Sequence, residues 1–307
     1  MARLNLFGLG LNAIILASSA VVGGGYLAGA NAFGQEVLVK NGEKIAFLGD
    51  SITQQGAGFP GGYVQLVMSG LEANGIKAVS IPAGIGGHKS PQMLERLERD
   101  VLSKKPEWML LSCGVNDVMH QGSNNGVMLE PYKANITQIL DKCKAAGVKV
   151  LVATATMIGE DPAGSANKTL EPYNAFLRDQ AKERGLPLAD LNAEMQAAVL
   201  LASDGGKRKG NHLTGDGVHM NLLGNRTMAL GVLRGFGLDA AGIAKAEAHW
   251  DALPGTGQVS LHLPLTYSQH QALTKQAAAK NKSVQELIVE RTMNDLKSTL
   301  SESPAMP

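Results

Sequence analysis

Residues 47–53 read Phe-Leu-Gly-Asp-Ser-Ile-Thr, an apolar run that ends abruptly at Gly-Asp-Ser. A serine at the carboxyl end of a buried strand is exposed in the crevice where open α/β sheets bind ligands. Ser51 is therefore a candidate nucleophile, although the same turn would also serve to cap a following helix. Three further segments lie downstream in a fixed order and help to decide between these interpretations.

The second segment is rich in glycine: residues 83–88 read Ala-Gly-Ile-Gly-Gly-His, after a short apolar run. Glycine lets the backbone approach a ligand closely and direct its N–H groups toward it. The alternative is a tight turn from a strand to a helix, because Ser90-Pro91 places a proline in the first turn of the next helix. Taken alone, this segment favours the turn.

The third segment, residues 108–117, is an apolar strand pattern that ends in Gly-Val-Asn-Asp. In a parallel sheet its carboxyl end lies at the same edge as Ser51. The side-chain amide of Asn116 is a neutral donor suited to a developing oxyanion. Either polar residue would also fit an Asx turn that binds its own backbone. We assign a turn of that kind to Asp117 and the chemistry to Asn116.

The fourth segment, residues 213–219, reads Leu-Thr-Gly-Asp-Gly-Val-His. On a loop, the Asp216 carboxylate can fold back and orient the His219 imidazole through one ring nitrogen, while the other nitrogen faces a serine. An isolated pair of this kind more often belongs to a surface loop or to half of a metal site. No His/Cys cluster with zinc spacing accompanies it, so we expect neither a metal nor a cofactor.

Together, the four segments resemble the conserved blocks of the SGNH hydrolase superfamily, the GDSL-type esterases and lipases, over residues 43–237. The ordered set is much more specific than any one segment. The resemblance implies Ser51 as nucleophile, His219 as base and Asp216 as the carboxylate that orients it. It also implies an oxyanion hole made of the backbone N–H groups of Ser51 and Gly87 and the side chain of Asn116.

The glycine-rich block departs from the pattern of the superfamily in detail. Gly84 and Gly86 compete with Gly87 for the oxyanion role, and His88 stands where many relatives carry Asp. We therefore expect the polar contacts around the oxyanion hole to differ. Three side chains beside the blocks are expected to contact substrate: Asp50, His88 and His120.

Strand-like apolar runs alternate with helical patterns through the middle of the chain, which is typical of a parallel sheet with helices on both faces. The expected fold is an α/β three-layer sandwich with a five-stranded parallel sheet, flavodoxin-like, as in SGNH hydrolases. The candidate strands are residues 44–48, 77–81, 108–112, 148–154 and 188–191. The candidate helices are residues 63–74, 91–102, 129–146, 170–184, 192–202 and 222–235. Loops are expected over 159–168 and 203–211.

The amino end has the features of an export signal. No charged residue occurs from Leu4 to Gln35, and Ala30-Asn31-Ala32 has the small-residue pattern of a signal-peptidase site. We expect residues 1–32 to be a signal peptide and the protein to be periplasmic or secreted. The alternative is an uncleaved N-terminal membrane anchor, because the uncharged stretch is long enough to span a bilayer.

The composition limits which binding partners and which state of the cysteines are expected. A net charge of +1 over 307 residues argues against electrostatic binding to nucleic acid. Cys113 and Cys143 are the only cysteines, and both lie in apparent core elements. We expect two buried free thiols, with a single bridge as the alternative in an oxidising compartment.

The character of the sequence changes after Trp250. Residues 253–257 are typical of a linker, 259–265 of a short strand, and 267–280 and 284–300 of two helices. The order strand-helix-helix faintly resembles ribbon-helix-helix modules, which pair through their strands. We therefore divide the chain into a hydrolase domain over 36–250 and an appendage over 256–307 that packs on the protein or forms a homodimer.

The expected function is that of an exported serine esterase that works through an acyl-enzyme, with an acetylated carbohydrate as substrate. A lysophospholipase, an arylesterase or a thioesterase stays open within the same chemistry, because the size of an acyl pocket cannot be read from one sequence. A non-catalytic carbohydrate- or surface-binding protein of the same fold is the alternative from another class. The presence of Ser51, Asn116 and His219 favours the enzyme.

Overall fold

The computed structural model describes residues 36–256 and 263–301, and these fall into two compact units that are described separately. The expected signal peptide, residues 1–32, lies outside the described residues, as does most of the expected strand over 259–265. Within the described ranges, no helix is long and apolar enough to cross a membrane.

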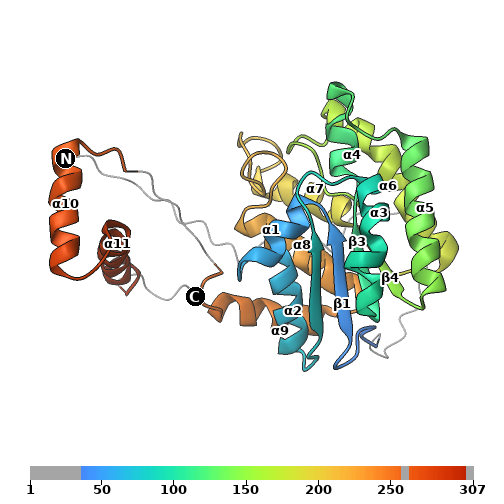
Figure 1. The fold of residues 1–307 in the computed structure, drawn as a ribbon, viewed down its shortest axis with the longest axis horizontal. Helices are drawn as coiled ribbons and strands as arrows, with labels where there is room; N and C mark the ends of the chain where they lie inside the picture. The colour runs from blue at the N-terminus through green and yellow to red at the C-terminus, as the bar shows by residue number, and fades with distance from the viewer. Residues whose placement is uncertain (1–35, 257–262, 302–307) are drawn as a thin grey trace. The chain divides into compact units, whose positions relative to one another are not determined.

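A five-stranded parallel sheet of order β2-β1-β3-β4-β5 forms the centre of the larger unit (Figure 1). The strands are β1 (Lys44–Gly49), β2 (Val79–Gly84), β3 (Trp108–Ser112), β4 (Lys149–Ala153) and β5 (Leu188–Ala189). The chain leaves β1 for β2 on one side and later returns to β3 on the other. The carboxyl ends of these three strands therefore meet at a topological switch point, where such sheets bind ligands.

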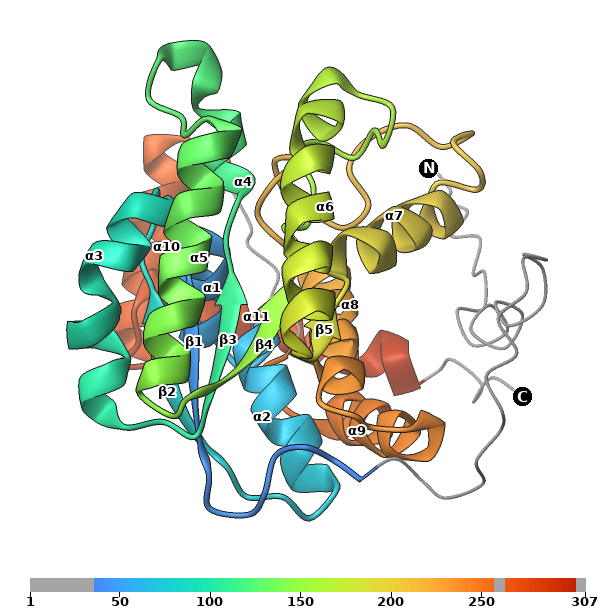
Figure 2. The ribbon, with the colours of Figure 1, turned by 90° about the vertical axis from the view of Figure 1, so that its right-hand side faces the viewer.

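Helices cover both faces of the sheet, which confirms the expected three-layer α/β fold. The helices of this unit are α1 (Ser51–Gly58), α2 (Tyr63–Ala73), α3 (Ser90–Asp100), α4 (Val115–Met119), α5 (Leu129–Ala145), α6 (Ser165–Arg184), α7 (Leu191–Ala202), α8 (Leu222–Gly235) and α9 (Ala240–Ala252). Figure 2 shows α3 and α5 on one side of the strands and α2 and α9 on the other. Helix α6 packs beside α5, and α8 packs between α2 and α7.

The core lies along the two central strands. Every residue of β3 is buried, and so is every residue of β1 after Lys44. Strands covered on both faces need continuous apolar runs, which explains why these two could be recognised from the sequence. Cys113 and Cys143 are buried free thiols, and burial raises the pKa of Cys143 to about 12.

Several expected boundaries were wrong, and the strand predicted over 77–81 runs instead from Val79 to Gly84. The loop predicted over 159–168 ends at Gly164, because α6 begins at Ser165. The predicted helix began at Leu170, which would have placed Pro172 in its first turn, whereas Pro172 lies inside α6. The strand predicted over 188–191 ends at Ala189, because Asp190 caps α7 by accepting a hydrogen bond from the Ala193 N–H.

The larger unit extends past Trp250, whose indole is buried and donates to the Leu66 carbonyl at 3.0 Å. The segment after α9 lies against the turn that joins α1 to α2. A Cβ added to Gly61 would lie 2.1 Å from the Thr256 carbonyl oxygen, so this contact requires glycine. A truncation that spares the unit should therefore follow Thr256.

The smaller unit consists of α10 (Tyr267–Ala279) and α11 (Val284–Ser301), which pack against each other. Each helix begins with a capping box: Thr266 with Gln269, and Ser283 with Glu286. Residues 263–265, the described remainder of the expected strand, have no regular secondary structure.

Candidate active site

Ser51 is the first residue of α1 and directly follows the turn at the end of β1. The Asp50 carboxylate caps this helix, because its Oδ1 accepts the Ile52 N–H at 2.9 Å. A Cβ on Gly49 would lie 2.0 Å from the Thr53 side-chain oxygen, so the sharp passage from strand to helix requires glycine. Packing and capping together hold Ser51 at the carboxyl edge of the sheet.

The structure brings Ser51, His219 and Asp216 together in one hydrogen-bonded chain. His219 Nε2 lies 2.9 Å from Ser51 Oγ, and His219 Nδ1 lies 2.6 Å from Asp216 Oδ2. When Nδ1–H donates to the carboxylate, Nε2 is left to accept the serine proton. This is the geometry in which a histidine can act as the general base for a serine nucleophile.

Asp216 folds back onto its own loop. Its Oδ1 accepts the N–H groups of Val218 at 2.9 Å and His219 at 2.7 Å, while Oδ2 accepts from the imidazole. These hydrogen bonds, led by the one from the His219 side chain, lower the pKa of Asp216 to about 2. The carboxylate is therefore ionised at neutral pH and can stabilise an imidazolium during proton transfer.

The glycine-rich turn after β2 lies beside Ser51. A Cβ on Gly86 would be 3.8 Å from the Ser51 Cβ, and the Gly86 N–H donates to Gln54 Oε1 at 2.8 Å. Gly87 has a φ of +75°, the left-handed conformation that favours glycine. This conformation lets Gly87 belong to a sharp turn next to the serine.

Asn116 lies in α4, just beyond β3, and only 4% of its surface is exposed. Its side-chain Nδ2 donates to the His88 carbonyl at 3.2 Å, which places the amide against the turn that contains Gly87. An amide nitrogen carries two hydrogens, so one stays available for a second acceptor.

For the neighbouring Asp117 the sequence suggested an Asx turn, whereas the structure shows its carboxylate bound to the start of α3. Its fully buried Oδ1 accepts the Ser90 N–H at 3.0 Å and the Ser90 hydroxyl at 2.6 Å. Burial raises the pKa of Asp117, against the effect of these donors. The residue thus joins α4 to the start of α3.

The three residues expected to contact substrate occupy different environments. Asp50 is only 3% exposed and serves as the helix cap described above, so its position fits a structural role. His88 and His120 are half-buried, and the Nδ1 atom of each lacks a hydrogen-bond partner in the described part of the chain. Neither imidazole hydrogen-bonds to the Ser51–His219–Asp216 chain.

The carboxyl of Asp50 predicts a specific pH dependence of stability. Burial, reinforced by the charge of Asp117, raises its pKa from 3.8 to about 6. As the pH rises, the unfolded chain loses this proton first, so the stabilisation by protonated Asp50 is complete below pH about 4 and is lost as the pH rises through about 6. A shift of roughly two pKa units corresponds to about 3 kcal/mol.

Asp50→Asn keeps an N-cap acceptor but removes this titration. Urea unfolding at about pH 4 and about pH 8 should give a free energy of unfolding that falls less in the variant than in the wild type. An equal change in both proteins would contradict the assigned shift.

Sequence reasoning missed Arg96, whose side chain is buried in α3. Its guanidinium donates to the Gly49 carbonyl and the Ala83 carbonyl, each at 2.8 Å, and to Asp100 at 3.2 Å. It therefore ties the carboxyl end of β1 to that of β2, immediately beneath the candidate site. The available signal was the placement of Arg96 beside Leu97, on the apolar face of the helix.

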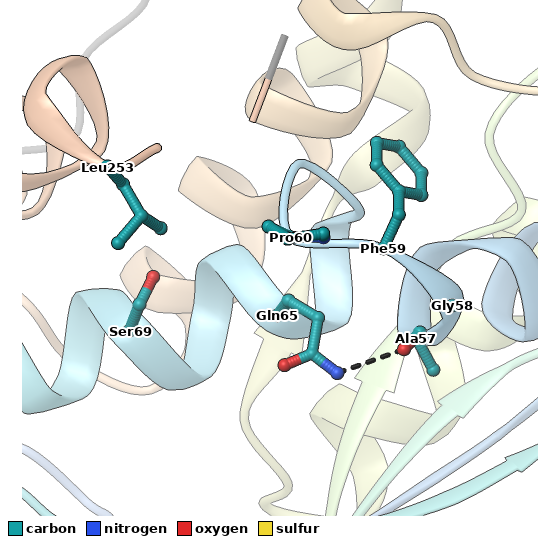
Figure 3. A pocket seen from close by; sticks show the side chains of 7 residues that line it. All are labelled: Ala57, Gly58, Phe59, Pro60, Gln65, Ser69 and Leu253. Carbon is teal, nitrogen blue, oxygen red and sulfur yellow. Dashed lines mark hydrogen bonds between the residues drawn. The ribbon is translucent and has the colours of Figure 1, made fainter. Parts of the chain in front are cut away.

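A cavity of about 350 Å³ lies at the other end of α1, away from Ser51 (Figure 3). It is lined by Ala57, Gly58, Phe59, Pro60, Gln65, Ser69 and Leu253. Among these lining residues, the Gln65 side chain donates to the Ala57 carbonyl at 2.9 Å. Among the described residues, no group of three or more His, Cys, Asp and Glu side chains is arranged to hold a metal ion.

Comparison with known proteins supports the resemblance over most of the chain. Residues 47–227 match the family model of the GDSL-like lipase/acylhydrolase family. An acetylxylan esterase of Geobacillus stearothermophilus is 26% identical over 220 residues, which cover 66% of this chain and 97% of that protein. The uncharacterized lipoprotein YqeF of Bacillus subtilis (strain 168) is 26% identical over 179 residues, which cover 50% of this chain and 71% of the lipoprotein.

Solved structures agree with this assignment. The acetyl xylan esterase AlAXEase is 33% identical, with a TM-score of 0.57 over 62% of this chain and 98% of that one. Axe2, an acetylxylan esterase from Geobacillus stearothermophilus, is 25% identical, with a TM-score of 0.59 over 66% of this chain and 97% of its own. The chain belongs to the GDSL-like lipase/acylhydrolase family of the SGNH hydrolase superfamily and is a serine ester hydrolase.

Proposed function

We propose that this protein removes acetyl groups from a carbohydrate through an acyl-enzyme on Ser51. The observation that carries the proposal is the hydrogen-bonded chain from Ser51 Oγ through His219 to Asp216, with distances of 2.9 and 2.6 Å. These three hydrogen-bonded side chains lie at the switch point of the sheet, beside the Gly87 turn and Asn116. A site that only bound carbohydrate would have no need of a base held against a serine hydroxyl.

The proposed mechanism has two halves. In the first, Ser51 Oγ attacks the ester carbonyl, its proton passes to His219 Nε2, and the alcohol leaves with that proton. In the second, water attacks the acyl-enzyme with His219 again as base, which releases acetate and restores Ser51. The N–H groups of Ser51 and Gly87 and the Asn116 side chain donate to the oxyanion of both tetrahedral intermediates.

The relatives support the substrate class. The three matches named as acetylxylan esterases align with this chain over 97% or 98% of their own lengths. Structures of Axe2 described as catalytic mutants carry alanine in place of a serine, an aspartate or a histidine. The aspartate and the histidine lie three residues apart there, as Asp216 and His219 do here.

The test is a substrate panel assayed with the purified protein. Acetate release from acetylated xylooligosaccharides should exceed that from other acetylated polysaccharides, and nitrophenyl acetate should be cleaved much faster than long-chain nitrophenyl esters. A preference for long acyl chains would instead favour a lysophospholipase or a thioesterase. Carbohydrate binding without any hydrolysis would favour a non-catalytic binding protein.

The oxyanion role of Asn116 predicts a measurable loss of rate. Asn116→Ala removes one donor to the developing oxyanion and should lower kcat by roughly 10²-fold with a folded protein. The exposed Asn125→Ala is the matched control and should keep wild-type kcat. A neutral Asn116→Ala combined with an inactive but folded Asp117→Ala would show that the wrong residue of the pair was chosen.

We also propose that the protein is exported and that cleavage follows residue 32. The sequence pattern of residues 1–32 supports this, and a relative described as a lipoprotein is consistent with it. Amino-terminal sequencing of protein collected outside the cytoplasm tests the proposal directly. A mature chain that begins near Phe33 is expected, whereas full-length protein in the membrane fraction would favour the anchor.

For the smaller unit we propose self-association. Helices α10 and α11 bury only Ala277 and Leu287 among the described hydrophobic side chains of this unit, too little for such a short segment to be stable alone. Val289, Met293 and Leu296 lie on one face of α11 and are exposed, at helical spacing. A second copy of this unit would cover that face with an identical one, as in isologous dimers.

Truncation after Thr256 tests whether the smaller unit serves self-association and the larger unit catalysis, because the proposed catalytic residues all precede Thr256. Size-exclusion chromatography with light scattering should show a dimer for the full chain and a monomer for the truncated one, with unchanged hydrolysis of nitrophenyl acetate. A full-length monomer would contradict self-association. A folded truncated protein that no longer cleaves this small ester would show that the smaller unit takes part in catalysis.

A further inference from the structure

The loop after β4 meets the loop that carries His219 through the Glu160 carboxylate and through one backbone hydrogen bond, from the Gly159 N–H to the Gly217 carbonyl. Glu160 accepts four hydrogen bonds from three consecutive residues of that second loop. Its Oε1 accepts the Leu213 N–H at 2.9 Å, the Thr214 N–H at 2.7 Å and the Thr214 hydroxyl at 2.6 Å. Its Oε2 accepts the His212 N–H at 2.6 Å.

Thr214 connects Glu160 to the part of the loop that bears the His219 imidazole. Its side-chain oxygen, which donates to Glu160, also accepts the Gly217 N–H at 3.0 Å. The next residue, Gly215, donates its N–H to the His219 carbonyl at 2.9 Å, and the Gly217 carbonyl accepts the Gly159 N–H at 2.7 Å. The segment from 214 to 219 is therefore a closed turn whose base is attached to Glu160.

Glu160 is itself held in place from α6. Asn167, only 7% exposed, accepts the Ile158 N–H at 2.9 Å through Oδ1. Its Nδ2 donates to the carbonyls of Ile158 at 3.0 Å, Gly159 at 3.2 Å and Asp161 at 2.8 Å. One buried amide thus fixes the backbone on both sides of Glu160 to the first turn of a long helix.

The contact between the two loops is stronger than an ordinary surface contact. Hydrogen bonds from backbone N–H groups to an ionised carboxylate are charge-assisted, and Thr214 is buried. Without the carboxylate, the N–H groups of residues 212–214 would lose their partner, which is costly where water has little access. His219 and Asp216 are themselves about one-third and one-half exposed, so packing alone does little to hold them.

We propose that Glu160 is a positioning residue that holds His219 in hydrogen-bonding reach of Ser51. The inference rests on the proposed function, since it concerns the base of that reaction. Glu160 forms no hydrogen bond with the side chains of Ser51, His219 or Asp216. It acts only through the backbone N–H groups of residues 212–214 and the Thr214 hydroxyl.

The experiment compares Glu160→Ala, Glu160→Gln and the control Glu98→Ala on an exposed face of α3, each in the full chain. Glu160→Ala should lower kcat for nitrophenyl acetate by about 10²-fold, the loss expected when a base is misplaced by about 1 Å. KM should change little, because Glu160 hydrogen-bonds to none of the proposed oxyanion-hole residues. Amide hydrogen exchange should rise over residues 212–219 and stay at the wild-type level over β1 and β3.

Glu160→Gln supplies the rescue. An amide oxygen can replace Oε1 and keep three of the four contacts, losing only the acceptor for the His212 N–H. It should therefore recover most of kcat and most of the protection, and it keeps the proposal testable if Glu160→Ala fails to fold. Glu98→Ala should match the wild type in both measurements.

Two results would overturn the proposal: a kcat for Glu160→Ala within about threefold of wild type, or a loss of kcat without faster exchange over residues 212–219. Failure of the proposed function is a separate outcome. In that case exchange in Glu160→Ala would still rise, while esterase activity in the wild type would be absent or would survive Ser51→Ala.

Discussion

Ser51→Ala should lower kcat/KM for ester hydrolysis by roughly 10³-fold or more while the protein stays folded. Ser51 is the hydroxyl that lies against a histidine base, at 2.9 Å from His219 Nε2. Alanine at the first position of α1 removes that hydroxyl but suits a helix, so the structure has no reason to collapse. Steady-state kinetics with nitrophenyl acetate and a far-ultraviolet circular dichroism spectrum check both halves of this expectation.

Ser103→Ala is the matched control for this variant. Ser103 follows α3 at the opposite edge of the sheet, is exposed, and donates to the Arg99 carbonyl. The control should keep the wild-type rate. Retention of more than about a tenth of that rate by Ser51→Ala would place the nucleophile elsewhere, because a missing nucleophile costs far more than tenfold.

His219→Ala should approach Ser51→Ala in severity, because the serine hydroxyl then has no base to take its proton. Asp216→Ala should be milder, since Asp216 only orients the imidazole and stabilises its charged form. With a pKa of about 2, the Asp216 carboxylate stays ionised through any practical assay. Its contribution should therefore be constant across the pH profile of kcat/KM, whose acid limb should not follow Asp216.

His249→Ala, on an exposed position of α9, is the control for the histidine variant. It should leave kcat/KM unchanged. An Asp216→Ala protein more impaired than His219→Ala would contradict the ranking and show that the carboxylate does more than orient the ring. A fully active His219→Ala would exclude His219 as the base.

Local pattern was enough to predict the two buried strands that lead into the site, but not α1 and α4, which carry Ser51 and Asn116. Buried parallel strands are continuous apolar runs, so β3 could be bounded correctly and β1 to within one residue. The parallel topology then follows from the alternation of strands and helices, and it places the segments of Ser51, Gly87 and Asn116 at one edge. Because the three segments share this edge, their short sequence patterns could be interpreted together as one site.

The residues that support the site could not be predicted in the same way. Glu160 and Arg96 each contact a backbone group about 50 residues away, and a backbone acceptor or donor leaves no mark on the sequence. A single glutamate in a polar loop and an arginine in an amphipathic helix are typical of solvated positions. The capping role of Asp50 could not be predicted for a related reason, because burial and capping of α1 depend on the packed helix.

The most direct test of the central claim is to label the intact wild-type protein with a fluorophosphonate and map the adduct by peptide mass spectrometry. Activated serines attack this probe and form a stable covalent adduct, as they do with an ester carbonyl. One adduct per chain is expected, on Ser51, with loss of esterase activity in proportion to labelling and no adduct in Ser51→Ala. An adduct on another residue, or an active enzyme that stays unlabelled, would contradict the assignment of Ser51 as the nucleophile.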